Sequence, residues 1–163
     1  GVRENQSNTI WSLAASYTLD AHTFTIANQR SSGDRGYDYG YGDGGSAIYL
    51  ANSYLSDFNY ADETSWQASY SIDFGTYGVP GLGFKTAYVT GSNIDTTNGN
   101  PNAESAEEGR EHEFYNQITY TVQEGPAKDL FFKVRSSVYR ATENVSTDVN
   151  EVRAYVEYPL SIL

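Results

Sequence analysis

The sequence VRAYVEYPLSIL, at residues 152–163, decides the fold class because apolar and polar side chains alternate along it. Successive side chains of a β-strand point to opposite faces, so this strand has an apolar face and a charged face. The apolar face contains Val152, Ala154, Val156, Tyr158 and Leu160. No other part of the sequence has the helical periodicity needed to cover such a face. The pattern favours the wall of a transmembrane β-barrel, apolar toward lipid and polar toward water.

The composition is compatible with a barrel and argues against several other classes. Of the 163 residues, 39% are hydrophobic, a figure that includes 15 tyrosines, and the mean hydropathy is −0.56. No stretch approaches the ~20 consecutive apolar residues of a membrane helix. The net charge of −11 argues against nucleic acid as a partner. The chain lacks cysteine, which excludes disulfides and Cys-ligated metals.

The chain begins Gly1-Val2-Arg3 and contains no methionine, so its first residue is not a translation start. No signal peptide is recognisable either. We therefore expect that a leader was removed or that the chain is the C-terminal part of a longer protein.

Alternation predicts about seven strands, each close to the ~9–11 residues that cross a bilayer as a tilted strand. The predicted strands are residues 9–18, 22–31, 65–74, 82–90, 111–123, 130–142 and 150–162. The connections between them alternate between short and long. Outer-membrane barrels have this asymmetry, with tight periplasmic turns at one rim and extended extracellular loops at the other. We place the short turns, such as Gly78–Gly81 and Gly125–Pro126, at the periplasmic rim.

The longest connection includes the sequence GDRGYDYGYGDGG at residues 33–45. Two interpretations stay open for it. It is either a surface loop or a segment that folds inward and narrows a pore.

Aromatic residues on the apolar face of the predicted strands gather at the strand ends, as two membrane interfaces require. Those toward the long-loop rim are Trp11, Trp66, Tyr88 and Phe114. Those toward the short-turn rim are Tyr17, Phe24, Phe74, Phe84, Tyr120, Phe132 and Tyr158. The alternative is that these side chains form the core of a soluble β-sandwich, where alternation also occurs.

The opposite parity is polar and carries the candidate site. Its basic residues are Lys85, Lys133, Arg135 and Arg153. The last three come from consecutive strands, which lie ~5 Å apart, so they form a local cationic track. Guanidinium groups bind carboxylates with two hydrogen bonds, which suits the passage of an anionic solute. The alternative is that they form ordinary surface ion pairs with Glu151 or Glu157.

The remaining charged and titratable residues carry no clear chemistry. Arg30 and Arg140 fall on the lipid-facing side of their strands, near the long-loop rim. The two histidines, His22 and His112, also fall on the lipid-facing side, at strand ends. The acidic residues gather in the long connections, where they are either solvated surface or a cation-attracting mouth. Their members are Asp34, Asp38, Asp43, Asp57, Asp62, Glu63, Asp95, Glu104, Glu107, Glu108 and Glu111. Glu111 and Glu113 share a face and could pair as acids.

Neither a phosphate loop nor a zinc or nucleophile motif is present, so we expect no enzyme activity, cofactor or metal.

Five segments of the chain resemble the OprD family of outer-membrane porins. They are SNTIWSLAASYTLDAH (7–22), YLANSYLSDFN (49–59), SWQASYSIDFGTYGVPGL (65–82), QEGPAKDL (123–130) and EYPLSIL (157–163). The resemblance implies an 18-stranded barrel that takes up small carboxylate-bearing nutrients along a lumenal ladder of arginine and lysine. By position, the ladder residues here are Lys133, Arg135 and Arg153, with Lys85 as an additional candidate. Seven strands cannot close such a barrel, so we interpret residues 1–163 as the C-terminal part of a single barrel domain.

The sequence therefore predicts an all-β chain in a bacterial outer membrane that takes part in passive uptake of amino acids, small peptides or aromatic acids. Its expected partners are these solutes, outer-membrane lipid and lipopolysaccharide, in a monomer or loose homo-trimer. Two alternatives stay open: a small barrel serving as an adhesin or anchor through its acidic loops, and a soluble β-sandwich.

Overall fold

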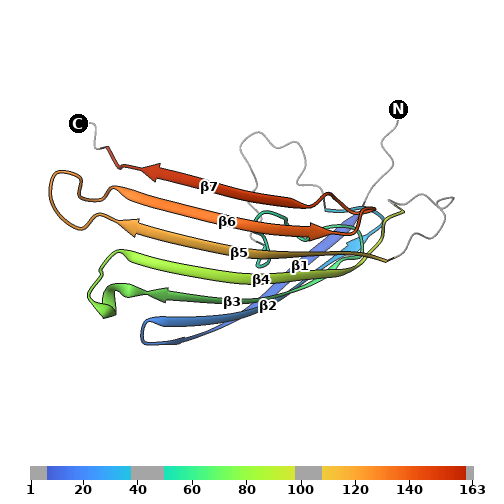
Figure 1. Ribbon diagram of the computed structural model, residues 1–163. Helices are drawn as coiled ribbons and strands as arrows, with labels where there is room; N and C mark the ends of the chain where they lie inside the picture. The colour runs from blue at the N-terminus through green and yellow to red at the C-terminus, as the bar shows by residue number, and fades with distance from the viewer. Residues whose placement is uncertain (1–6, 38–49, 98–107, 161–163) are drawn as a thin grey trace.

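The computed structural model describes residues 7–37, 50–97 and 108–160, which form one antiparallel sheet (Figure 1). Its seven strands lie side by side in chain order. They are β1 (Asn8–Leu19), β2 (His22–Gly33), β3 (Thr64–Asp73), β4 (Leu82–Ile94), β5 (Gly109–Thr121), β6 (Phe131–Ala141) and β7 (Val149–Glu157). A single turn of 3₁₀ helix, η1 (Phe74–Tyr77), follows β3. Within the described residues no helix is long and apolar enough to span a membrane.

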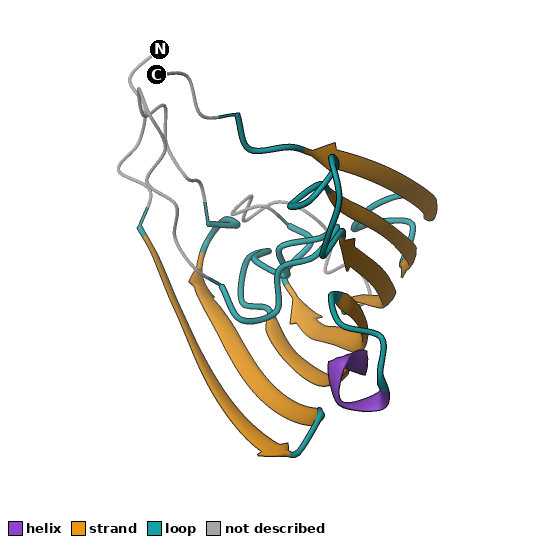
Figure 2. Cartoon of the chain, turned by 90° about the vertical axis from the view of Figure 1, so that its left-hand side faces the viewer, coloured by secondary structure: helices purple, strands orange, loops and turns teal. Residues whose placement is uncertain are grey.

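The sheet is curved like a trough, and connecting segments lie on its concave side (Figure 2). The other face is apolar and open: Leu13, Ile26 and Val152 are 71%, 62% and 73% exposed. Among the described strand residues, buried side chains such as Ala27, Gln29, Val89 and Glu113 lie on the inner face. The soluble-sandwich interpretation, in which the aromatic parity is the core, is therefore wrong. Trp66 is 55% exposed and lies on the outer face.

The predicted alternation of short and long connections holds for the first four, at residues 20–21, 34–63, 74–81 and 95–108, whereas the last two, at 122–130 and 142–148, are similar in length. The short-turn connections at 20–21, 74–81 and 122–130 lie together at one end of the strands, and the other three lie at the opposite end (Figure 1). Glycines with positive φ shape the short ones: Gly78 (84°), Gly81 (85°) and Gly125 (80°). At Gly81 a Cβ would lie 2.4 Å from the carbonyl oxygen of Thr121, so glycine is required there for space as well as for conformation.

Most strand ends differ from the sequence prediction by one to five residues, and two of these differences have a clear local cause. Phe74 begins η1 instead of ending β3, because Asp73 caps the 3₁₀ turn by accepting a 2.8 Å hydrogen bond from the Gly75 amide. β7 ends at Glu157, five residues before the predicted Ile162. Proline has no N–H to donate to a ladder, so Pro159 cannot continue the strand. Residues 161–163 lie outside the described part of the chain.

Candidate functional site: a basic row on the inner wall

Strand register places three of the four predicted basic residues in one row across the sheet. Lys85 of β4 is opposite Gln117 of β5, Gln117 is opposite Arg135 of β6, and Arg135 is opposite Arg153 of β7. Residues directly opposite in antiparallel strands share a face, so all of these lie on the concave side. With strands ~4.8 Å apart, Lys85 and Arg135 are separated by about 10 Å. Lys133 lies in the adjacent row on the same face, between Thr119 of β5 and Tyr155 of β7.

Tyrosine rings hold these cations in place. Lys133 Nζ lies 4.3 Å from the ring centre of Tyr155, and the Arg135 guanidinium carbon lies 5.5 Å from the same ring. Each distance is within the range of a cation–π interaction. Arg153 instead forms a 2.6 Å ion pair with Glu151 of its own strand. For Arg153 the structure therefore shows the alternative interpretation, an ion pair with Glu151, while Arg135 faces an aromatic ring.

Lys85 also lies beside an aromatic ring, which comes from the long connection. Its Nζ lies 4.9 Å from the ring centre of Tyr54, and the Tyr54 ring lies 4.4 Å from that of Tyr115 on β5. The alternation of β5 and β7 identifies Tyr115 and Tyr155 as inner-face residues. No periodicity marks Tyr54, because it belongs to an irregular segment.

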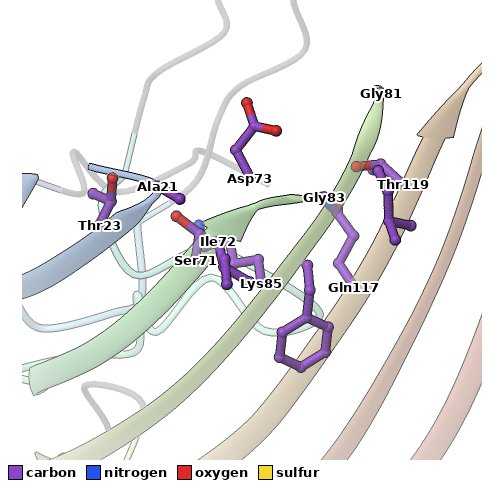
Figure 3. A pocket seen from close by; sticks show the side chains of 12 residues that line it. Ala21, Thr23, Ser71, Ile72, Asp73, Gly81, Gly83, Lys85, Gln117 and Thr119 are labelled. Atoms are coloured by element: carbon purple, nitrogen blue, oxygen red, sulfur yellow. The ribbon is translucent and has the colours of Figure 1, made fainter. Parts of the chain in front are cut away.

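A hollow of about 390 Å³ adjoins the basic row toward the short-turn end (Figure 3). Lys85 and Gln117 line it together with hydroxyl-bearing side chains, and the Asp73 carboxylate, which accepts a hydrogen bond from the Gly75 amide, lies at its border. Those hydroxyls belong to Thr23, Ser71 and Thr119. An ammonium group surrounded by hydroxyl and amide donors is suited to receive a carboxylate.

The segment at residues 50–63, which we call the inner segment, is fixed to the wall at the other end of the row. The Gln29 amide donates to the carbonyl oxygens of Asp57 (2.8 Å) and Phe58 (2.9 Å). The Glu113 carboxylate accepts hydrogen bonds from the amides of Leu55 (3.0 Å) and Ser56 (3.1 Å). This half of the connection therefore folds inward. Of the Gly-, Tyr- and Asp-rich stretch at residues 33–45, positions 38–45 lie outside the described part of the chain.

Two acidic residues that the sequence placed among the acids of the long connections, Glu63 at the end of the inner segment and Glu111 on β5, are buried where the segment meets the wall. Glu63 is 0% and Glu111 1% exposed, and neither takes part in the ion pairs found among the described residues. Glu111 accepts hydrogen bonds from Ser56 Oγ (3.0 Å) and from the Tyr139 hydroxyl. Burial and, secondly, the charge of Glu111 raise the pKa of the Glu63 carboxyl to about 10. The interpretation of these two as solvated or mouth-lining acids is wrong.

The pairing suggested for Glu111 and Glu113 is also wrong. Each carboxylate binds donors of the inner segment, Glu111 through Ser56 Oγ and Glu113 through two backbone amides. A carboxylate that already accepts several hydrogen bonds is satisfied without a neighbouring acid.

The histidines and the outer arginines lie where the sequence puts them. His22 is on the outer face, with its ring nitrogens 2.7 Å and 2.9 Å from the hydroxyls of Tyr70 and Tyr77. Arg140 forms an ion pair with Asp148 (3.4 Å) near the long-loop end. In the described ranges no three His, Cys, Asp or Glu side chains are grouped to hold a metal ion.

Comparison with known proteins gives consistent matches. A family model described as "outer membrane porin, OprD family" matches residues 3–162. Porin D of Pseudomonas aeruginosa is 49% identical over 96% of this chain and 39% of its own length. The porin-like protein GalP of Pseudomonas putida is 33% identical over 89% of this chain and 32% of its own length. The chain thus spans well under half the length of these relatives.

Solved structures match equally well. A crystal structure of Pseudomonas aeruginosa OprD has a TM-score of 0.85 and 47% identity, covering 98% of this chain and 44% of that one. The structure of Acinetobacter baumannii OccAB1 has a TM-score of 0.83 and 40% identity, covering 93% of this chain and 36% of that one.

Proposed function

Because the chain belongs to the OprD family of outer membrane porins, we propose that the protein containing it is a passive, substrate-selective channel for small carboxylate-bearing solutes. The chain itself forms part of the wall of a β-barrel in the bacterial outer membrane and belongs to a family of channels, not enzymes. In this proposal residues 1–163 contribute to one barrel domain. The solutes are amino acids, small peptides or aromatic acids, and their concentration gradient drives uptake without a cofactor.

The observation that supports this proposal most strongly is the basic row. Lys85, Arg135 and Arg153 share one register row, and Lys133 lies one row away on the same face. Neighbouring cations of the row are about 5 to 10 Å apart, so a carboxylate that leaves one cation is close to the next and its desolvation is offset at each step. The contacts with Tyr155 restrict the side-chain conformations of Lys133 and Arg135.

The adhesin or anchor alternative receives less support from the geometry. It requires acidic loop residues that are available to a partner, yet Glu63 and Glu111 are buried against the wall. We propose a monomer or a loose homo-trimer, in contact with lipid and lipopolysaccharide through the apolar outer face.

The test is conductance of the complete porin in planar bilayers with carboxylate salts. We expect the double substitution Arg135→Ala with Arg153→Ala to lower the carboxylate conductance or the preference for carboxylate over the cation. Removing two fixed positive charges weakens the local attraction for anions.

Arg140→Ala is the matched control, because Arg140 belongs to the same strand as Arg135 but lies on the outer face. It should leave both quantities unchanged. Equal behaviour of the double variant and the unmodified porin would refute the role of the row.

A further inference from the structure

Two buried carboxyl groups meet over a glycine beneath the inner segment. Gly91 of β4 is directly opposite Glu111 of β5. A Cβ built on Gly91 would lie 1.8 Å from Glu63 Oε1 and 3.2 Å from Glu111 Cγ. Both acidic side chains therefore occupy the space that any other residue at position 91 would fill.

The hydrogen bonds around the pair assign different roles to its two members. Glu111 accepts from Ser56 and Tyr139, which is the behaviour of an ionised carboxylate. Glu63 Oε2 accepts from the Tyr60 amide (3.0 Å), whereas no group of the described residues donates to the buried Oε1. Oε1 lies beside the Glu111 side chain, and a buried oxygen without a donor next to a carboxylate is satisfied if it carries a proton itself.

We propose that Glu63 is a protonated acid which donates a hydrogen bond to the Glu111 carboxylate, and that this bond is a proton-dependent latch holding the inner segment on the wall. Glu63 closes the inner segment at its junction with β3, and Glu111 belongs to β5, so the bond spans the segment and the wall. Glu63 and Glu111 are positioning residues in this proposal. The latch goes beyond the proposed solute class and requires only that the barrel conducts.

The other titratable groups facing the pair do not replace this proton. β5 contributes Glu113, β6 contributes Tyr139, and the inner segment contributes Tyr60, so no cation faces the pair from the described elements. β2, β3 and β4 present Gln29, Ser65 and Gly91 there, which do not titrate. Burial, and secondly the Glu111 charge, raise the pKa of Tyr60, so this hydroxyl stays neutral at physiological pH.

The sign of the pH effect follows from the raised pKa of Glu63. When the segment leaves the wall, Glu63 reaches water and regains its ordinary pKa of about 4.5, whereas the docked value is about 10. Docking is therefore strongest at pH values below the ordinary pKa and weakens as pH rises toward the docked value. Between the two pKa values, Glu63 gives up one proton when the segment is released from the wall. The ratio of released to docked segment therefore rises about tenfold per pH unit.

The experiment measures both conductance and hydrogen exchange of the complete porin from pH 5.5 to 9. Exchange reports on the amides of Leu55 and Ser56, which bind Glu113 only when the segment is docked. In the unmodified porin we expect their protection factors to fall with pH toward the tenfold-per-unit limit, while conductance rises. Glu63→Gln is the decisive variant, because an amide donates to Glu111 without a titratable proton. It should keep the segment docked and remove the pH dependence.

Gly91→Ala serves as a second variant, since the added Cβ displaces Glu63 and should release the segment at every pH. Heat-modifiable migration on gels verifies that each variant is a folded barrel. Equal pH profiles for the unmodified porin and Glu63→Gln would overturn the latch, as would unchanged protection in a folded Gly91→Ala variant. Conducting variants without these differences refute the latch alone, whereas a folded barrel that conducts at no pH refutes the proposed channel.

Discussion

At the scale of single residues, the inner wall depends on tyrosines as much as on its cations. Tyr155 lies beside both Lys133 and Arg135, whose charges would otherwise repel each other across adjacent rows. The negative face of the ring attracts both groups and restricts their rotamers. Neither cation takes part in an ion pair among the described residues, so both remain available to an anionic solute.

Tyr155→Leu should therefore weaken the interaction of the porin with carboxylates without removing any charge. A cation–π contact at an exposed site contributes about 0.5–1 kcal/mol, which corresponds to a roughly two- to fivefold higher half-saturation concentration. Concentration-dependent conductance with a carboxylate salt measures this change. Tyr155→Phe keeps the ring and should behave as the unmodified porin does. If the leucine variant saturates at the same concentration as the phenylalanine variant, the ring does not position the cations.

At the scale of elements, the strands were predictable because their inner and outer faces differ in composition at every second residue. All seven strands and the inner-face positions of Lys85, Lys133, Arg135 and Arg153 follow from that period. The inner segment was not predictable, because irregular backbone has no period. In the sequence, the residues that anchor it, Gln29 and Glu113, do not differ from the other polar residues of the water-facing side. Their hydrogen bonds to backbone groups of the segment arise only in the folded structure.

The inner segment provides a prediction at this scale through Gln29. Its amide donates to two carbonyl oxygens, and its Oε1 accepts from the Asn52 amide (3.3 Å). Gln29→Ala leaves these buried groups without partners, at a cost of about 1–3 kcal/mol for each unsatisfied group. We expect the segment to detach and single-channel conductance to increase at every pH.

The matched control is Asn28→Ala on the same strand. Asn28 pairs across the sheet with Trp66, on the outer face, and donates to the Ser65 carbonyl (3.0 Å). It should leave conductance unchanged. A Gln29→Ala porin with the conductance of this control would show that Gln29 does not hold the segment.

At the scale of the whole molecule, the sheet has the inverse of a soluble protein's organisation. Large apolar side chains such as Leu13, Ile26 and Val152 are exposed on the outer face, whereas charged and polar side chains such as Gln29, Glu111 and Glu113 are buried on the inner face. The edges β1 and β7 each have one strand neighbour in the described sheet. Backbone groups in hydrocarbon need hydrogen-bond partners, so we expect both edges to pair with further strands of the barrel. The solved relatives are long enough to supply them, since this chain covers 44% of the matched OprD chain.

This organisation predicts opposite tolerance to charge on the two faces of one strand. Ile26 lies on the outer face near the middle of β2, and Thr25 beside it lies on the inner face, where its hydroxyl is 2.7 Å from Ser16 Oγ. Ile26→Arg should destabilise the folded barrel by about 2–4 kcal/mol, because an arginine near the bilayer midplane loses its hydration. Thr25→Arg loses one exposed hydrogen bond, which contributes about 1 kcal/mol, and keeps its charge in water. Urea-dependent unfolding of the complete porin in lipid vesicles measures both free energies. Equal destabilisation by the two substitutions would contradict the assignment of the outer face to lipid, and a larger loss for Thr25→Arg would reverse it.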